Sequence, residues 1–218
     1  MTPRAAPSRL AGALLAAAFG AAAGAARADD VTSSAERTKG ARTVVGAPGS
    51  TDCAAAAATG VSDDDAVAAC DRALQTERLT RANRIVTLIN RGAIHLRRRS
   101  GEAALADFEA VVALEPRNAD AHLNRGAALV MVRRHGDAVA AITDALRFGV
   151  SVPHKAYFNR AAAREAMGDV RGAYEDYNTA LTIQPDWGAA EAELARFARG
   201  RRERLAAQLR DPAAAGTQ

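Results

Sequence analysis

Apolar residues lie at helical spacing in the segment 187–210. Leu194, Phe197 and Leu205 are separated by three and eight residues, which places them roughly on one side of an α-helix. The pattern predicts an amphipathic helix with one packed face and one polar face. A helix of this kind can cap the end of a helical array.

A longer regularity runs through the segments before this helix. Asn-Arg-Gly-Ala begins at Asn90 and again at Asn124, 34 residues later, and Asn-Arg-Ala-Ala begins at Asn159 after a further 35 residues. This period is typical of paired antiparallel helices that stack on one another, because no single pair can bury its own apolar face. The abundance of alanine and an aromatic content of only 4% also favour helices over β-sheet.

The repeat resembles the tetratricopeptide-repeat (TPR) family. The family pattern has a bulky residue and then a small residue in the first helix of each repeat. In the second helix it has an alanine, an aromatic residue and another alanine, and a proline ends the repeat. The last repeat fits this pattern with Tyr157, Ala161, Ala173, Tyr177, Ala180 and Pro185. The first repeat carries Leu88, Gly92, Ala104, Phe108, Val111 and Pro116. In the middle repeat Val150 replaces the proline, and one extra residue follows.

The resemblance implies an all-α fold, a right-handed superhelical solenoid of helical hairpins with a C-terminal capping helix. Three repeats would span residues 81–186, after a degenerate first hairpin at residues 51–80. The capping helix would occupy residues 187–210. The small residue in each first helix would let its partner helix approach closely.

Two cysteines lie in the degenerate hairpin. In the register that the resemblance implies, Cys53 and Cys70 lie on facing sides of its two helices, so we predict a disulfide between them in an oxidising compartment. Two buried free thiols and a redox role are the alternatives. The spacing resembles neither a metal site nor a haem-attachment motif.

The resemblance also implies where a partner would bind. In this family the first helices line a concave groove, and function generally comes from that groove. An asparagine recurs in each first helix and can bond the backbone of an extended peptide, while large apolar residues offer a floor. The predicted groove residues are Asn90, Asn124, Asn159, Ile89, Leu123, Phe158 and Lys155. The alternative is that asparagines and small residues merely suit the helix surface.

Some members of the family bind the C-terminal carboxylate of a partner with a clamp of two lysines, two asparagines and an arginine. Only Asn124 and Lys155 match that clamp, because Ile89, Ala93 and Asn159 replace its other members. We therefore do not expect binding of the cytosolic-chaperone type.

Arginines gather at the turns between paired helices. Stacking of the hairpins would place these arginines on one edge of the solenoid. They are Arg97, Arg98, Arg99, Arg133, Arg134 and Arg164. This basic edge suggests an alternative function, the binding of lipid, polysaccharide or nucleic acid. Solvated arginines that complement the helix dipoles would explain the same pattern.

The N-terminal segment indicates export. Arg4 and Arg9 precede an apolar stretch that ends in an Ala-Arg-Ala cleavage site, the pattern of a signal peptide over residues 1–28. An uncleaved membrane anchor is the alternative, but the stretch is short and only weakly hydrophobic. Cleavage would remove three arginines and no acid, lowering the formal net charge from +4 to +1, which makes nucleic acid an unlikely partner.

The mature chain is expected to be periplasmic or secreted, with no transmembrane segment. Residues 29–50 and 211–218 have no periodic apolar face, so they are predicted to form a flexible leader and a disordered tail.

Catalysis is not expected from this sequence. It has no nucleophile elbow, no phosphate-binding glycine loop and no paired histidines on a helix. We expect no cofactor, no metal and no small-molecule substrate. The predicted function is a non-catalytic scaffold of the cell envelope that binds a protein or peptide partner in its groove.

Overall fold

The computed structural model describes residues 48–76 and 78–210. The predicted signal peptide, most of the predicted leader and the predicted tail lie outside these residues. The described residues form nine α-helices and no strand. The helices are α3 (Pro48–Thr59), α4 (Asp64–Thr76), α5 (Arg81–Arg97), α6 (Gly101–Leu114), α7 (Ala119–Met131), α8 (His135–Arg147), α9 (Pro153–Ala166), α10 (Val170–Ile183) and α11 (Gly188–Arg210).

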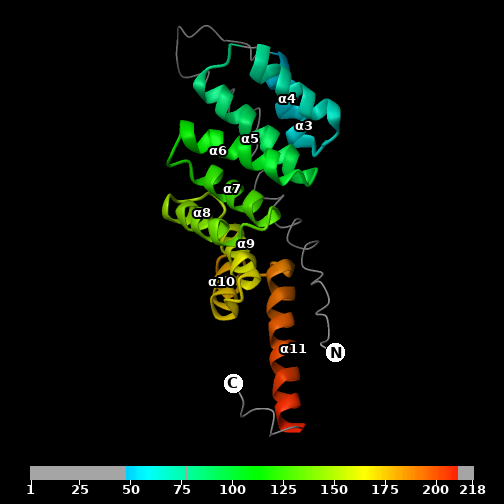
Figure 1. Cartoon of the computed structure of the whole chain (residues 1–218), viewed down its shortest axis with the longest axis vertical. Helices are drawn as coiled ribbons and strands as arrows, with labels where there is room; N and C mark the ends of the chain where they lie inside the picture. Colours follow the sequence, from blue (N-terminus) through cyan, green and yellow to red (C-terminus); the bar gives the residue numbers. More distant parts are fainter. Residues whose placement is uncertain (1–47, 77, 211–218) are drawn as a thin grey trace, which may run out of the picture.

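Helices α3 to α10 form four hairpins that stack in chain order (Figure 1). Each first helix from α5 onward packs against its own second helix and against the second helix of the hairpin before it. The predicted all-α repeat solenoid is confirmed. Helix α3 begins at Pro48, three residues before the predicted start of the first hairpin.

Small residues let the two helices of a hairpin approach closely. A Cβ atom added to Gly92 of α5 would lie 2.7 Å from Cζ of Phe108 on α6. Gly126 of α7 faces Ile142 of α8 in the same way, and Ala161 of α9 is fully buried. The large side chain that fills each gap therefore comes from the second helix, as the resemblance implied.

Buried aspartates bind arginines within two of the hairpins. Nη2 of Arg91 lies 2.6 Å from Oδ1 of Asp107, and the same guanidinium contacts Asp71 of α4 at 2.5 Å. Arg160 pairs with Asp176 in the same manner, at 2.8 Å. Hydrogen bonds to these aspartates raise the pKa of Arg91 and of Arg160. Because Asp107 and Asp176 are each only 3% exposed, their charges depend on these arginines.

These ion pairs were not predicted from the sequence, although the spacing that indicates them is simple. In both pairs the aspartate follows its arginine by 16 residues. The middle repeat has Ala141 at that distance from Arg125. The side chain of Arg125 accordingly makes no hydrogen bond or ion pair with any residue that the structure describes, and its Nε is buried.

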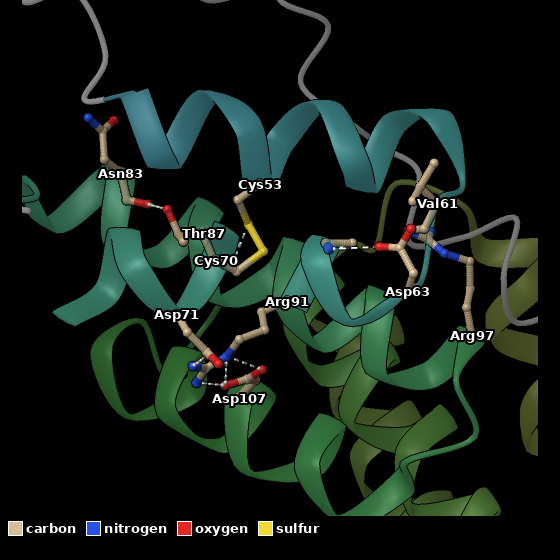
Figure 2. Close-up of a disulfide and its surroundings, with 11 residues drawn as sticks. Cys53, Val61, Asp63, Cys70, Asp71, Asn83, Thr87, Arg91, Arg97 and Asp107 are labelled. Atoms are coloured by element: carbon tan, nitrogen blue, oxygen red, sulfur yellow. Dashed lines mark hydrogen bonds and ion pairs between the residues drawn. A yellow bond between two sulfur atoms is a disulfide. The ribbon is translucent and has the colours of Figure 1, made fainter. Parts of the chain in front are cut away.

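A disulfide joins Cys53 of α3 to Cys70 of α4, with the two Cα atoms 4.7 Å apart (Figure 2). Both cysteines are completely buried. Sγ of Cys53 lies 3.8 Å from the carbonyl oxygen of Thr87, and Ile94 packs against the same cluster. The bridge therefore holds the first hairpin together at the place where it meets α5.

Replacing Asp176 by asparagine should destabilise the last repeat, because Arg160 and Arg164 would both lose the buried carboxylate of Asp176. We expect the free energy of unfolding to fall by about 3 kcal/mol, measured by urea unfolding followed by circular dichroism. Asp144→Asn removes the exposed ion pair with Arg147 and is the matched control, with an expected loss below about 1 kcal/mol. Equal losses in the two variants would contradict the structural role of Asp176.

Candidate functional site

The candidate site is the surface formed by the first helices α5, α7 and α9, which contact one another along the stack. Asn90, Asn124 and Asn159 occupy the same place in these helices, at separations of 34 and 35 residues. Their exposed fractions are 8%, 3% and 3%. The three asparagines therefore form a nearly buried row, where an exposed one was expected.

These asparagines have unused hydrogen-bonding capacity. No side-chain hydrogen bond from Asn90, Asn124 or Asn159 reaches another residue in the described part of the chain, and Nδ2 of Asn159 is buried without a partner. A buried polar group without a partner costs about 1–3 kcal/mol, and folded proteins contain few of them. The row is therefore a candidate for contact with a bound molecule.

Two of the three residues predicted to form the apolar floor of the groove are buried. Leu123 is 1% exposed and packs with Ala156 of the next hairpin. Phe158 is 2% exposed, and its ring centroid lies 4.9 Å from that of Trp187, just before α11. Leu123 and Phe158 were predicted to line the floor of the groove, but α9 helps to cover Leu123, and Trp187, just before α11, helps to cover Phe158. Ile89 is only partly buried.

Lys155 is partly buried on α9 and has no ion-pair partner among the described residues. Burial lowers the pKa of its ammonium group. A carboxylate from a bound molecule would favour the charged form of Lys155 and raise that pKa. Val86 occupies the corresponding place on α5 and is 43% exposed, so one end of the row is apolar and the other is basic.

Two arginines of the predicted basic edge fasten the first hairpin. Arg98 donates to the carbonyl oxygen of Ser62 at 3.3 Å and pairs with Asp64. Nη2 of Arg97 lies 3.5 Å from the carbonyl oxygen of Val61 (Figure 2). Both arginines therefore hold the turn between α3 and α4 onto the end of α5.

Two further arginines of that edge are also engaged. Nη1 of Arg164 lies 2.9 Å from the buried carboxylate of Asp176, and Arg134 pairs with an aspartate three residues later. Arg99 and Arg133 are exposed and have no partner among the described residues. Four of the six arginines predicted to form the basic edge therefore have acceptors within the hairpins, which leaves the side chains of Arg99 and Arg133 as its unpaired charges in the described part of the chain.

A cleft that the sequence did not predict lies between α4, α5 and α6, with a volume of about 220 Å³. Its polar lining consists of Asp64, Asp71, His95, Arg98 and Ser100. Nδ1 of His95 is buried without a partner, and burial lowers the pKa of this imidazole. Both aspartates already pair with arginines, so the cleft offers a ligand fewer unpaired groups than the asparagine row does.

Among residues 48–76 and 78–210, no group of three or more His, Cys, Asp or Glu side chains could hold a metal ion. None of the helices formed by these residues is both long and apolar enough to cross a membrane.

Comparison with known proteins supports the fold. No family and no curated protein matches the sequence. Among solved structures, the crystal structure of MamA has a TM-score of 0.58 and 21% identity, over 68% of this chain and 84% of that chain. The first TPR domain of the human RPAP3 protein has a TM-score of 0.51 and 22% identity, over 58% of this chain and 96% of that chain.

The second TPR domain of human RPAP3, in complex with the HSP70 peptide SGPTIEEVD, has a TM-score of 0.50 and 23% identity. The alignment covers 54% of this chain and 97% of that domain. These likenesses define the class of fold: the chain is a TPR-like helical solenoid.

The two free arginines at the hairpin turns have strained backbones. Arg99 and Arg133 have φ angles of 60° and 65°, and the third repeat has Gly168 at the corresponding place with a φ of 85°. We expect Arg99→Gly to raise the free energy of unfolding by about 0.5 kcal/mol, because glycine adopts this conformation without a Cβ clash.

Thermal or urea unfolding measures this change. Arg99→Ala is the control, because it removes the same guanidinium and keeps a Cβ atom. An alanine variant as stable as the glycine variant would show that backbone strain is not the cause.

Proposed function

We propose that this chain is a protein-interaction scaffold in which the first helices α5, α7 and α9 hold an extended segment of a partner protein. The observation that carries the proposal is the row of Asn90, Asn124 and Asn159, whose side-chain amides have no partner among the described residues. An amide can donate to a peptide carbonyl and accept from a peptide N–H. Three such groups in register suit the regular backbone of an extended peptide.

Peptide binding on this fold is established for related structures. The second TPR domain of human RPAP3 is in complex with an HSP70 peptide, and the first TPR of Spaghetti is bound to the HSP90 peptide SRMEEVD. The present chain matches the carboxylate clamp of some TPR-family members only at Asn124 and Lys155. We therefore propose that the row recognises peptide backbone within a segment and does not require a free C-terminus.

The binding of polyanions is the weaker candidate. Arg97, Arg98, Arg134 and Arg164 all have acceptors within the chain, so few free charges remain at the hairpin turns. Polyanion binding would also fall steeply as salt rises, whereas hydrogen bonds from the asparagine row would be far less sensitive.

Changing Asn90, Asn124 and Asn159 together to alanine should abolish most of the peptide affinity. Peptides selected by the purified protein from a random displayed library would serve as probes, with binding measured by calorimetry at low and high salt. We expect the dissociation constant to rise about 10-fold or more, since each lost hydrogen bond is worth about 1 kcal/mol.

The matched control is Asn178→Ala, which removes an amide from α10 that bonds the carbonyl oxygen of Tyr174. Circular dichroism would show that both variants are folded. The proposal fails if the triple variant binds the selected peptides as tightly as the wild type does.

We further propose that the scaffold works in the cell envelope as an exported bacterial protein. The support is the signal-peptide pattern of residues 1–28 together with the bridge between Cys53 and Cys70, since disulfides persist in oxidising compartments. The protein isolated from its cells should have the mass of a chain that begins near Asp29, with both thiols resistant to alkylation before reduction. A full-length mass, or two freely alkylated cysteines, would count against export.

A further inference from the structure

Helix α11 occupies the place of the first helix of a further hairpin. It packs against the last repeat through Ala190, Leu194 and Phe197. It is 23 residues long, whereas α9 and α10 have 14 each, and its later part projects beyond the stack (Figure 1). Within the described residues, no second helix follows to pair with it.

The face of α11 that would meet such a second helix is uncovered. In the three repeats this face is marked by the small residue of the first helix, and Gly92, Gly126 and Ala161 are all buried there. Ala195 follows Ala161 by 34 residues and holds the same place in α11. Ala195 is exposed, and no second helix within the described residues covers it.

The neighbouring surface of α10 is uncovered as well. Val170 and Tyr174 are 49% and 47% exposed, and they hold the places that Gly101 and Leu105 have in the first repeat, where both are buried. The ring of Tyr174 lies 6.2 Å from that of Phe197 on α11. In the first repeat α7 packs over these places, so α11, which holds the corresponding position after the last repeat, covers less of its neighbour than α7 does.

The uncovered face of α11 is complementary to itself. Its residues Glu191, Ala195, Ala198 and Arg202 are spaced by four, three and four positions, so they form one stripe along the helix. All four are exposed, and neither Glu191 nor Arg202 makes an ion pair with any described residue. Reversing the direction of the stripe exchanges the two charged ends and leaves the alanines in the middle.

We propose that α11 pairs with α11 of a second copy of this chain, antiparallel, about a two-fold axis between residues 196 and 197. In this register Ala195 of each copy faces Ala198 of the other, and Glu191 of each copy faces Arg202 of the other. The alanines allow close approach of the two helices, and the two equivalent ion pairs fix the register. A two-fold interface requires this kind of self-complementary surface.

The antiparallel direction is the one that the two helices of each hairpin already have. Each copy of α11 would therefore take the place of a second helix beside α11 of the other copy. The dimer does not rest on the proposed function, although it would join two asparagine rows in one assembly and strengthen binding to a partner with two segments.

The molar mass of the purified chain, measured by size exclusion with light scattering, should be twice 22.7 kDa at high concentration. If the export signal has been removed, the reference is the mass of the shortened chain. Glu191→Arg or Arg202→Glu creates two like-charge contacts per dimer, so each variant should raise the dissociation constant about 10-fold or more.

Mixing the two variants provides the decisive measurement. One chain then carries arginine at both places and the other carries glutamate at both, so the mixture should form one-to-one heterodimers with both ion pairs restored. Arg199→Glu and Glu203→Arg reverse charges of exposed residues outside the stripe and should leave the dimer intact.

Circular dichroism would show that every variant keeps its helices. The proposal would be overturned by a wild-type chain that stays monomeric at about 100 μM, which is a high concentration for a specific interface. Dimers that persist unchanged in both Glu191→Arg and Arg202→Glu, or a mixture that fails to form heterodimers, would overturn it equally.

Discussion

The close contact between the paired helices is the constraint on which the rest of the structure depends. A single hairpin cannot bury its own apolar residues, so each hairpin must stack on the next. Gly92 and Gly126 bring the second helices close enough for Phe108 and Ile142 to fill the space between the helices. A larger residue at either place would separate the helices and displace the hairpins that follow. The asparagines of α5, α7 and α9 lie in one row because this spacing is repeated.

The two ends of the stack of hairpins differ in how they are stabilised. At the first end a disulfide joins α3 to α4, which are short helices with few large apolar side chains to hold them together. At the other end α11 covers only part of the last repeat and leaves Val170 and Tyr174 exposed. A covalent bond therefore completes the first end, whereas the second end has surface for another helix.

The structural polar residues have partners within the chain, whereas the candidate functional ones do not have them among the described residues. Arg91 and Arg160 reach buried aspartates, and these pairs help to hold the hairpins together. The asparagine row has no such partners in the described part of the chain, although it is just as buried. Because Nδ2 of Asn159 is buried without a partner and an unpaired buried amide is costly, the row is a better indication of a ligand than arginines that already have acceptors are.

The sequence by itself determined the hairpin period, the small residues at the helix contacts and the two cysteines on facing helices, because all of these follow from spacing that repeats along the chain. It could not determine which side chains the neighbouring hairpin would cover. The sequence pattern predicted that Leu123 and Phe158 line the floor of a groove, yet both are buried, with Ala156 of α9 packed against Leu123 and Trp187 against Phe158. The sequence predicted Arg164 as part of a basic edge, but in the folded chain its guanidinium pairs with Asp176. Burial and pairing depend on contacts between elements that are distant in the sequence, so only the tertiary structure decided them.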